Sequence, residues 1–96
     1  MHFIIFCTDK PNCLNIRIAN RPAHVKYLEN HIENVLVAGP TLGHKTGEMN
    51  GSMLIVDFPG LSEAQTFAED DPYAVAGLFE SVVVKPWKMV IEPQNK

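Results

Sequence analysis

The sequence has little basic charge and no long apolar stretch. Its 96 residues hold 8 Lys and Arg against 11 Asp and Glu, a formal net charge of −3, with no basic run. A surface that follows a phosphate backbone concentrates Lys and Arg, so we expect no nucleic-acid partner. No segment approaches the roughly 20 apolar residues that span a bilayer, and no basic region precedes the first apolar run. We therefore expect a cytoplasmic protein with no membrane partner.

Cysteines and cofactor motifs are also scarce. The two cysteines, Cys7 and Cys13, occur without an export signal and are expected to be free thiols, Cys7 in the core. The segment 39–46 has a glycine-rich start, but its spacing departs from a phosphate-binding loop. His24 and His31 are two helical turns apart, about 10 Å, too far to share one metal ion. The sequence predicts neither a metal nor an organic cofactor.

The apolar residues that are present indicate a folded chain. Hydrophobic residues make up 46% of the sequence, charged residues only 20%, and the apolar positions are spread along the whole length. Disordered segments have the opposite balance. A chain of this length is expected to form one domain over residues 1–96, with a disordered tail from about residue 93.

Hydrophobic periodicity predicts the order strand, helix, strand, strand, helix, strand. Strands are expected at 3–8, 35–42, 52–58 and 79–91; helical turns at 14–20 with a main helix beginning around Pro22; a helix capped by Ser62; and a short helix over 71–76 that ends at Gly77. This order is typical of the α+β, ferredoxin-like βαββαβ arrangement, a four-stranded antiparallel sheet with its helices on one face. Val25, Leu28 and Ile32 are expected to form the core stripe of the first helix.

Two strands are apolar on both of their faces, whereas helices cover only one face of such a sheet. The first, 3–8, reads as a strand buried on both sides. In the last strand, apolar residues point to either side: Phe79, Val83, Trp87, Met89 and Ile91 to one, and Val82, Val84 and Val90 to the other. A monomer rarely leaves so large an apolar face in water. We therefore expect a homodimer that packs sheet on sheet.

Two groups of polar residues could carry chemistry. Arg17, Arg21 and His24 follow one another at spacings of four and three, which places them along one side of a helix. This strip would attract anions, although a solvated basic face gives the same spacing. In the second group, Asp71 precedes Pro72 and is typical of a helix cap, while Tyr73 offers a phenolic donor. A capping carboxylate still has a free oxygen that can orient an imidazole.

Taken together, these motifs resemble the YciI family over residues 1–91. The matching segments are Arg17, Arg21–His24, Ala38–Pro40, Gly51–Ser52, Asp70–Tyr73 and Val84–Trp87. The resemblance implies a dimeric α+β barrel of ferredoxin-like protomers, each with a pocket whose active centre is a His–Asp pair. On this sequence the pair is His24 and Asp71. The expected substrate-binding residues are Arg17, Arg21, Gly39, Pro40, Ser52 and Tyr73. The chain departs from the family pattern at Trp87 and in its short loop 44–50.

Two functions of different classes agree with these residues. In the first, a cofactor-independent lyase, isomerase or dehydrochlorinase, Asp71 holds His24 in one tautomer, and His24 removes a proton from a small anionic or cyclic metabolite. Arg21, with Arg17, would stabilise the developing anion. In the second, the same pocket is a binding site in a non-catalytic small-ligand-binding or accessory module. Because the fold alone does not determine the reaction, the site has to distinguish the two.

Overall fold

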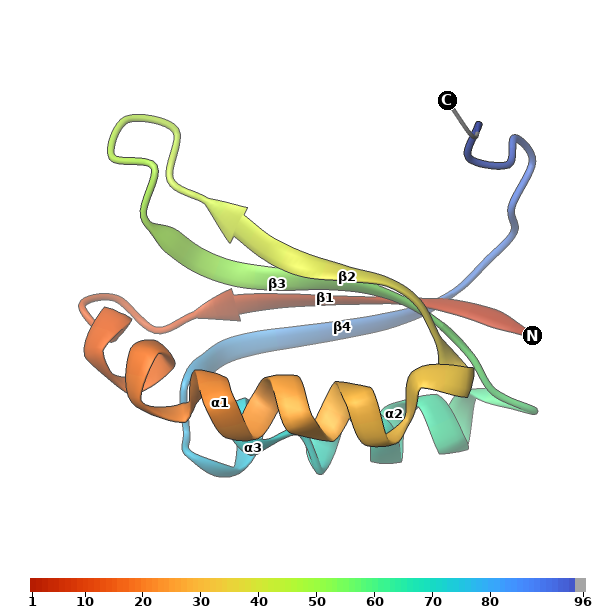
Figure 1. Ribbon diagram of the computed structural model, residues 1–96, viewed down its shortest axis with the longest axis horizontal. Helices are drawn as coiled ribbons and strands as arrows, with labels where there is room; N and C mark the ends of the chain where they lie inside the picture. The colour runs from red at the N-terminus through yellow and green to blue at the C-terminus, as the bar shows by residue number, and fades with distance from the viewer. Residues whose placement is uncertain (95–96) are drawn as a thin grey trace.

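A computed structural model of the chain, which describes residues 1–94, has one sheet with its helices packed on a single face (Figure 1). The elements in chain order are β1 (His2–Asp9), α1 (Leu14–Asn30), the 3-10 turn η1 (Ile32–Asn34), β2 (Val35–Leu42), β3 (Met49–Asp57), α2 (Leu61–Glu69), α3 (Pro72–Val75) and β4 (Phe79–Trp87). None of the helices in this part of the chain is long and apolar enough to cross a membrane.

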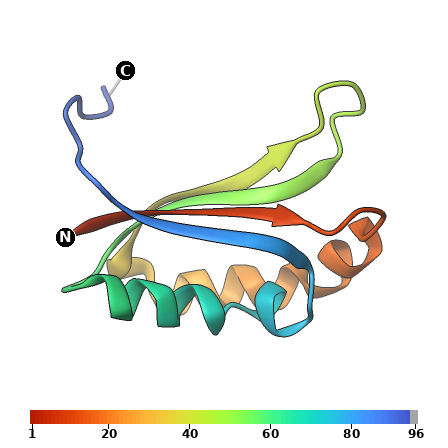
Figure 2. The same cartoon turned by 180° about the vertical axis from the view of Figure 1, so that it is seen from behind.

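The sheet has four strands in the order β2-β3-β1-β4, and all three neighbouring pairs are antiparallel. Consecutive strands β2 and β3 form a hairpin, while β1 lies between β3 and β4 in the centre. Seen from behind, α1 and α2 run below the sheet along the same face (Figure 2). The predicted α+β, ferredoxin-like βαββαβ topology is confirmed.

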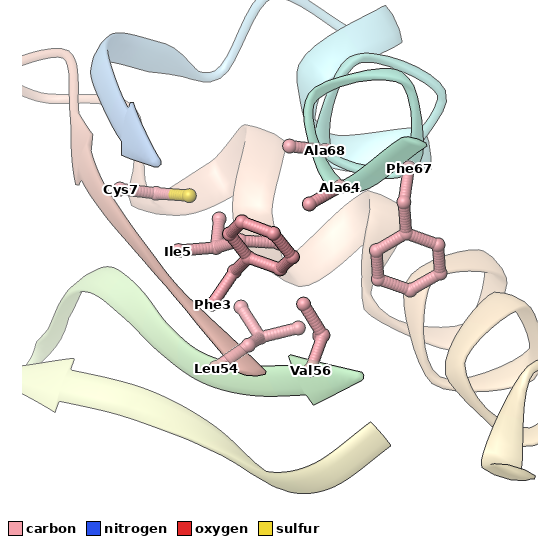
Figure 3. Packing of buried hydrophobic residues seen from close by; sticks show 8 residues of the cluster. All are labelled: Phe3, Ile5, Cys7, Leu54, Val56, Ala64, Phe67 and Ala68. Atoms are coloured by element: carbon pink, nitrogen blue, oxygen red, sulfur yellow. The ribbon is translucent and has the colours of Figure 1, made fainter. Parts of the chain in front are cut away.

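The apolar core lies between the central strands and α2. Alternate residues of β1 and β3 point toward the helices, and α2 meets them with a phenylalanine and two alanines, which allow close approach (Figure 3). The cluster consists of Phe3, Ile5, Cys7, Leu54, Val56, Ala64, Phe67 and Ala68. Burying each large apolar side chain contributes roughly 1.5–3 kcal/mol, so this cluster dominates the stability of the fold.

Helix α1 differs from its sequence prediction. It is one helix of 17 residues with Pro22 inside it, rather than two segments separated there. Figure 1 shows its first turns at an angle to the rest, as expected where a proline removes a backbone donor. The predicted core stripe is confirmed only for Leu28, which packs against the core cluster; Val25 and Ile32 are exposed, and the buried residues of α1 are Arg17 and His24. This helix turns polar side chains inward.

The start of α2 and the end of β4 also differ from their predictions. Helix α2 begins at Leu61 with Gly60 as its N-cap, so Ser62 lies inside the helix. Strand β4 ends at Trp87 instead of continuing to Ile91. Residues 93 and 94 of the predicted tail carry no helix or strand, and residues 95 and 96 lie outside the described residues.

The register of β4 corrects the predicted assignment of its faces. Thr8 of β1 pairs with Ser81, but the next residue of β1 pairs with Phe79, which leaves Glu80 as an extra residue. This irregularity turns Phe79 to the helix side, where it packs against the core cluster instead of lying beside Val83. Val84 also packs on the core.

The other face of the sheet is apolar and uncovered in the single chain. Four of its side chains are 37–46% exposed: Phe6, Val37, Val83 and Trp87. Because Phe6 is open to solvent, the prediction that residues 3–8 are buried on both sides is wrong for the chain alone. We call this surface, opposite the helices, the outer face.

Candidate active site

The imidazole of His24 and the carboxylate of Asp71 meet inside the helical layer. Nδ1 of His24 lies 2.9 Å from both carboxylate oxygens of Asp71, and the two side chains are only 11% and 7% exposed. These residues are 47 positions apart in the chain. Since a carboxylate only accepts hydrogen bonds, this geometry holds the Nδ1–H tautomer of the imidazole. Nε2 is then the ring nitrogen left free to exchange a proton.

Asp71 is fixed by the start of helix α3. It is the N-cap of that helix, and its Oδ1 accepts a hydrogen bond from the backbone N–H of Tyr73 at 2.9 Å. Pro72 takes the first helical position, where its missing N–H is not needed. Gly77, with φ of +77°, comes just after the helix, as predicted. The capping role and the contact with His24 therefore occur together in one carboxylate.

Tyr73 provides a flat surface for the imidazole. The rings of His24 and Tyr73 are stacked, with centroids 4.1 Å apart and planes 18° apart. Tyr73 is 1% exposed, and burial raises the pKa of its phenol despite the opposing charge of Arg17. The phenol therefore keeps its proton at neutral pH and can act as a hydrogen-bond donor.

Arg17 lies inside the wall of the site and is paired there. Its Nε and Nη2 donate to the two oxygens of Asp9 at 2.7 and 2.8 Å, and Nη2 also donates to Oγ of Ser52 at 2.9 Å. Its Cζ lies 4.5 Å from the ring centre of Tyr73. Burial alone would lower the pKa of Arg17, but the hydrogen bond and charge of Asp9 outweigh it and raise the pKa.

A small cavity opens between α1 and the β2–β3 half of the sheet. Its volume is about 140 Å³, close to that of a cavity that holds one benzene ring. Its lining combines cationic, aromatic and hydroxyl groups with apolar ones. The lining residues are Arg17, Arg21, His24, Val25, Leu28, Ala38, Gly39, Pro40, Met49, Ser52 and Tyr73.

The cavity gathers all six predicted substrate-binding residues and His24. Arg21 is exposed at its rim, and its guanidinium makes no side-chain hydrogen bond or ion pair within residues 1–94. His31 is elsewhere: its Nδ1 donates to the carbonyl of Tyr27 at the end of α1. In the described part of the chain, no three His, Cys, Asp or Glu residues are grouped to hold a metal ion.

Sequence reasoning missed two kinds of residue at this site. No role was predicted for Asp9, although it forms the buried ion pair with Arg17. Val25 and Leu28 were predicted only as core residues, and no role was predicted for Met49, yet all three line the cavity. The presence of an arginine eight positions after Asp9 was the one available signal, and this spacing has no fixed meaning between a strand and a helix.

Comparison with known proteins identifies the family of this chain. The model of the YCII-related domain matches residues 1–88. This chain belongs to the YCII-related family. The protein YciI of Escherichia coli O6:H1 is 38% identical over 94% of this chain and 99% of its own, and a Haemophilus influenzae protein is 37% identical over the same shares.

A solved structure is also similar over most of the chain. It is 5-chloro-2-hydroxyhydroquinone dehydrochlorinase from Burkholderia phenoliruptrix in complex with 2,5-dihydroxybenzoquinone. That protein is 42% identical, with a TM-score of 0.87 over 92% of this chain and 94% of its own. The likeness supports membership of an enzyme-containing family with the dimeric α+β barrel type of fold.

Proposed function

We propose that this protein is a cofactor-independent enzyme that uses His24 and Asp71 for acid–base chemistry on a small cyclic substrate. The observation that carries the proposal is a buried His–Asp pair at the wall of a cavity sized for one six-membered ring. An imidazole whose Nδ1–H is held by a carboxylate and whose Nε2 is free is typical of a general base with its orienting group. The similar dehydrochlorinase, which binds a dihydroxybenzoquinone, supports a hydroxylated ring as the substrate class.

The reaction we propose is elimination or isomerisation. Nε2 of His24 takes a proton from a ring hydroxyl or an acidic carbon, and the electron pair left behind moves into the ring. In an elimination the ring carbon that carries the leaving group is tetrahedral, as in the keto tautomer of a hydroxylated ring, and the electron pair forms a new C=C bond as chloride departs; in an isomerisation the proton returns to another atom of the ring. Asp71 stabilises the imidazolium formed in this step, since its carboxylate accepts from Nδ1 at 2.9 Å.

The lining of the cavity supports this assignment of roles. Arg21 is an exposed cation at the rim and is placed to attract the substrate and the developing anion. Gly39 and Pro40 form part of the opposite wall, along with the thioether of Met49, and they suit the flat apolar faces of a ring. The substrate class is therefore a single ring with hydroxyl or oxyanion groups on one edge.

We also propose that two copies associate through the outer face. Its exposed Phe6, Val83 and Trp87 would then be removed from water. The helices and the cavity lie on the opposite side of the sheet and stay open to substrate.

Both thiols are free, in agreement with a cytoplasmic location.

Chloride release from 5-chloro-2-hydroxyhydroquinone by the purified protein tests the catalytic proposal. We expect turnover by the wild type and a loss of about 10²-fold or more in His24→Gln, the scale of a missing general base. Calorimetric titration with 2,5-dihydroxybenzoquinone should show that this variant still binds the ligand. Binding without turnover in the wild type, with this compound and with related hydroxylated rings, would instead identify a non-catalytic binding module.

A further inference from the structure

Two contacts restrain the imidazole of His24, and they restrain different motions. The hydrogen bond to Asp71 fixes the direction of Nδ1 but allows the ring to turn about that bond. The stack on Tyr73, with planes only 18° apart, fixes the plane of the ring and hence the direction of Nε2. The proposed proton transfer needs both directions to be correct. The placement of the Tyr73 ring is therefore as important as the carboxylate.

The Tyr73 ring has its own support from a buried ion pair. Arg17 lies with Cζ 4.5 Å from the ring centre, and its guanidinium is planar, so it can pack on an aromatic ring in a defined orientation. The guanidinium is itself fixed by a two-point contact with Asp9, in which the two side chains are 2% and 6% exposed. A third bond, to Ser52, ties it to strand β3.

We propose that Asp9 and Arg17 are positioning residues that fix the plane of the catalytic imidazole through Tyr73. This inference rests on the proposed function of His24 and adds a second line of support, which begins at the end of β1 and reaches the imidazole through the Tyr73 ring. It also assigns different roles to the two arginines of the cavity. Arg17 holds the ring of Tyr73, while Arg21, at the rim, contacts the ligand.

Arg17→Lys is the discriminating variant because it keeps the charge and removes the planar two-point fork. The stack places the ring protons of His24 over an aromatic face, so their NMR signals in the wild type should be shifted upfield. We expect Arg17→Lys to lose this shift, to lower kcat by roughly 10²-fold, the scale of a misplaced catalytic group, and to leave KM nearly unchanged. If Arg17 were an anion contact, lysine would preserve both activity and the shift.

Two further variants keep the test independent of folding and of the substrate. Asp9→Asn/Arg17→Gln removes both charges together, so that no unpaired charge is left buried, and it should also lose the upfield shift. The matched control, Arg21→Gln, should keep the shift and raise KM. Retention of the shift in both Arg17 variants would overturn the proposal. If the Arg17 variants lose the shift but the wild type turns over no ring substrate, the positioning role is supported and the proposed catalysis is rejected.

Discussion

The two helices that pack against the sheet make opposite kinds of contact with it. Helix α2 turns Ala64, Phe67 and Ala68 onto β1 and β3 and completes an apolar core. Helix α1 is longer, yet its buried residues are Arg17 and His24, and it leaves a cavity against the β2–β3 half of the sheet. One half of the helical layer therefore supplies apolar burial, and the other half holds the proposed catalytic pair at a cost in such burial.

A deletion in the apolar half should give the largest loss of stability. Phe3→Ala removes a fully buried ring from the central strand, which should lower the free energy of unfolding by about 3–5 kcal/mol. Urea denaturation followed by circular dichroism measures this loss. In the comparison variant His24→Gln, the expected change is smaller than for Phe3→Ala, while turnover is lost. Equal destabilisation by the two would break the distinction between the halves.

Alkaline pH should lower the free energy of unfolding through Cys7, a core residue that lies near the charge of Asp71. Cys7 belongs to the core cluster, and burial, aided by the nearby charge of Asp71, raises the pKa of its thiol from 9.0 to about 12. Below pH 9 the thiol is neutral in both the folded and unfolded states. Above pH 9 the unfolded thiol ionises while the folded one does not, so stability falls as pH rises toward 12, by roughly 1.4 kcal/mol per pH unit.

Urea denaturation between pH 8 and pH 11 measures this slope. Tyr27, whose pKa is raised by burial to about 12, contributes in the same direction above pH 10. The slope of Cys7→Ala should therefore be shallower than that of the wild type from pH 9 upward, whatever the variant's absolute stability. Parallel curves for the two proteins would show that Cys7 ionises as freely in the fold as in the unfolded chain.

The two roles of Asp71 can be separated by substitution. Asp71→Ala removes the cap of α3 and should lower stability by about 1 kcal/mol, whereas Asp71→Asn keeps a side-chain oxygen for the Tyr73 N–H and should lose much less. Both variants lose the charge that orients and stabilises the imidazole, so both should lose activity. Thermal unfolding and a turnover assay give the two readouts. An active Asp71→Asn enzyme would contradict the proposed acid–base role.

The sequence predicted the core half more directly than the polar half. The apolar run at residues 3–8 and the turn signals around the hairpin predicted the strand order, and strand β2 begins and ends where it was predicted. The assumption that a helix buries its apolar stripe failed for α1, because the buried side of that helix is a polar site with partners of its own. Val25 is apolar and faces the cavity, not the core.

The His24–Asp71 pair and the Asp9–Arg17 pair differ in how they could be found. The first pair was placed by family resemblance, and its members carry a local signal, a helix face and a helix cap. The second pair joins a strand end to a helix across a loop, and no periodicity links its members. Contacts of this kind depend on the tertiary packing of β1 against α1, so they become visible only in the fold.

The smallest expected effect on the chain's own stability is on the outer face, which neither half of the helical layer covers. Phe6 is 43% exposed in the single chain, so Phe6→Lys removes little burial within it. If two copies pack sheet on sheet, however, Phe6→Lys places a charge in an apolar interface and should separate the copies. Sedimentation velocity at micromolar concentration should then show the mass fall from twice the chain mass in the wild type to the 10.7 kDa monomer in the variant. Ile32→Lys, an equally apolar exposed position beyond the end of α1 on the helical side, is the matched control and should leave the dimer intact. A wild type that sediments as a monomer, or a dimer that tolerates Phe6→Lys, would mean that the outer face has another role.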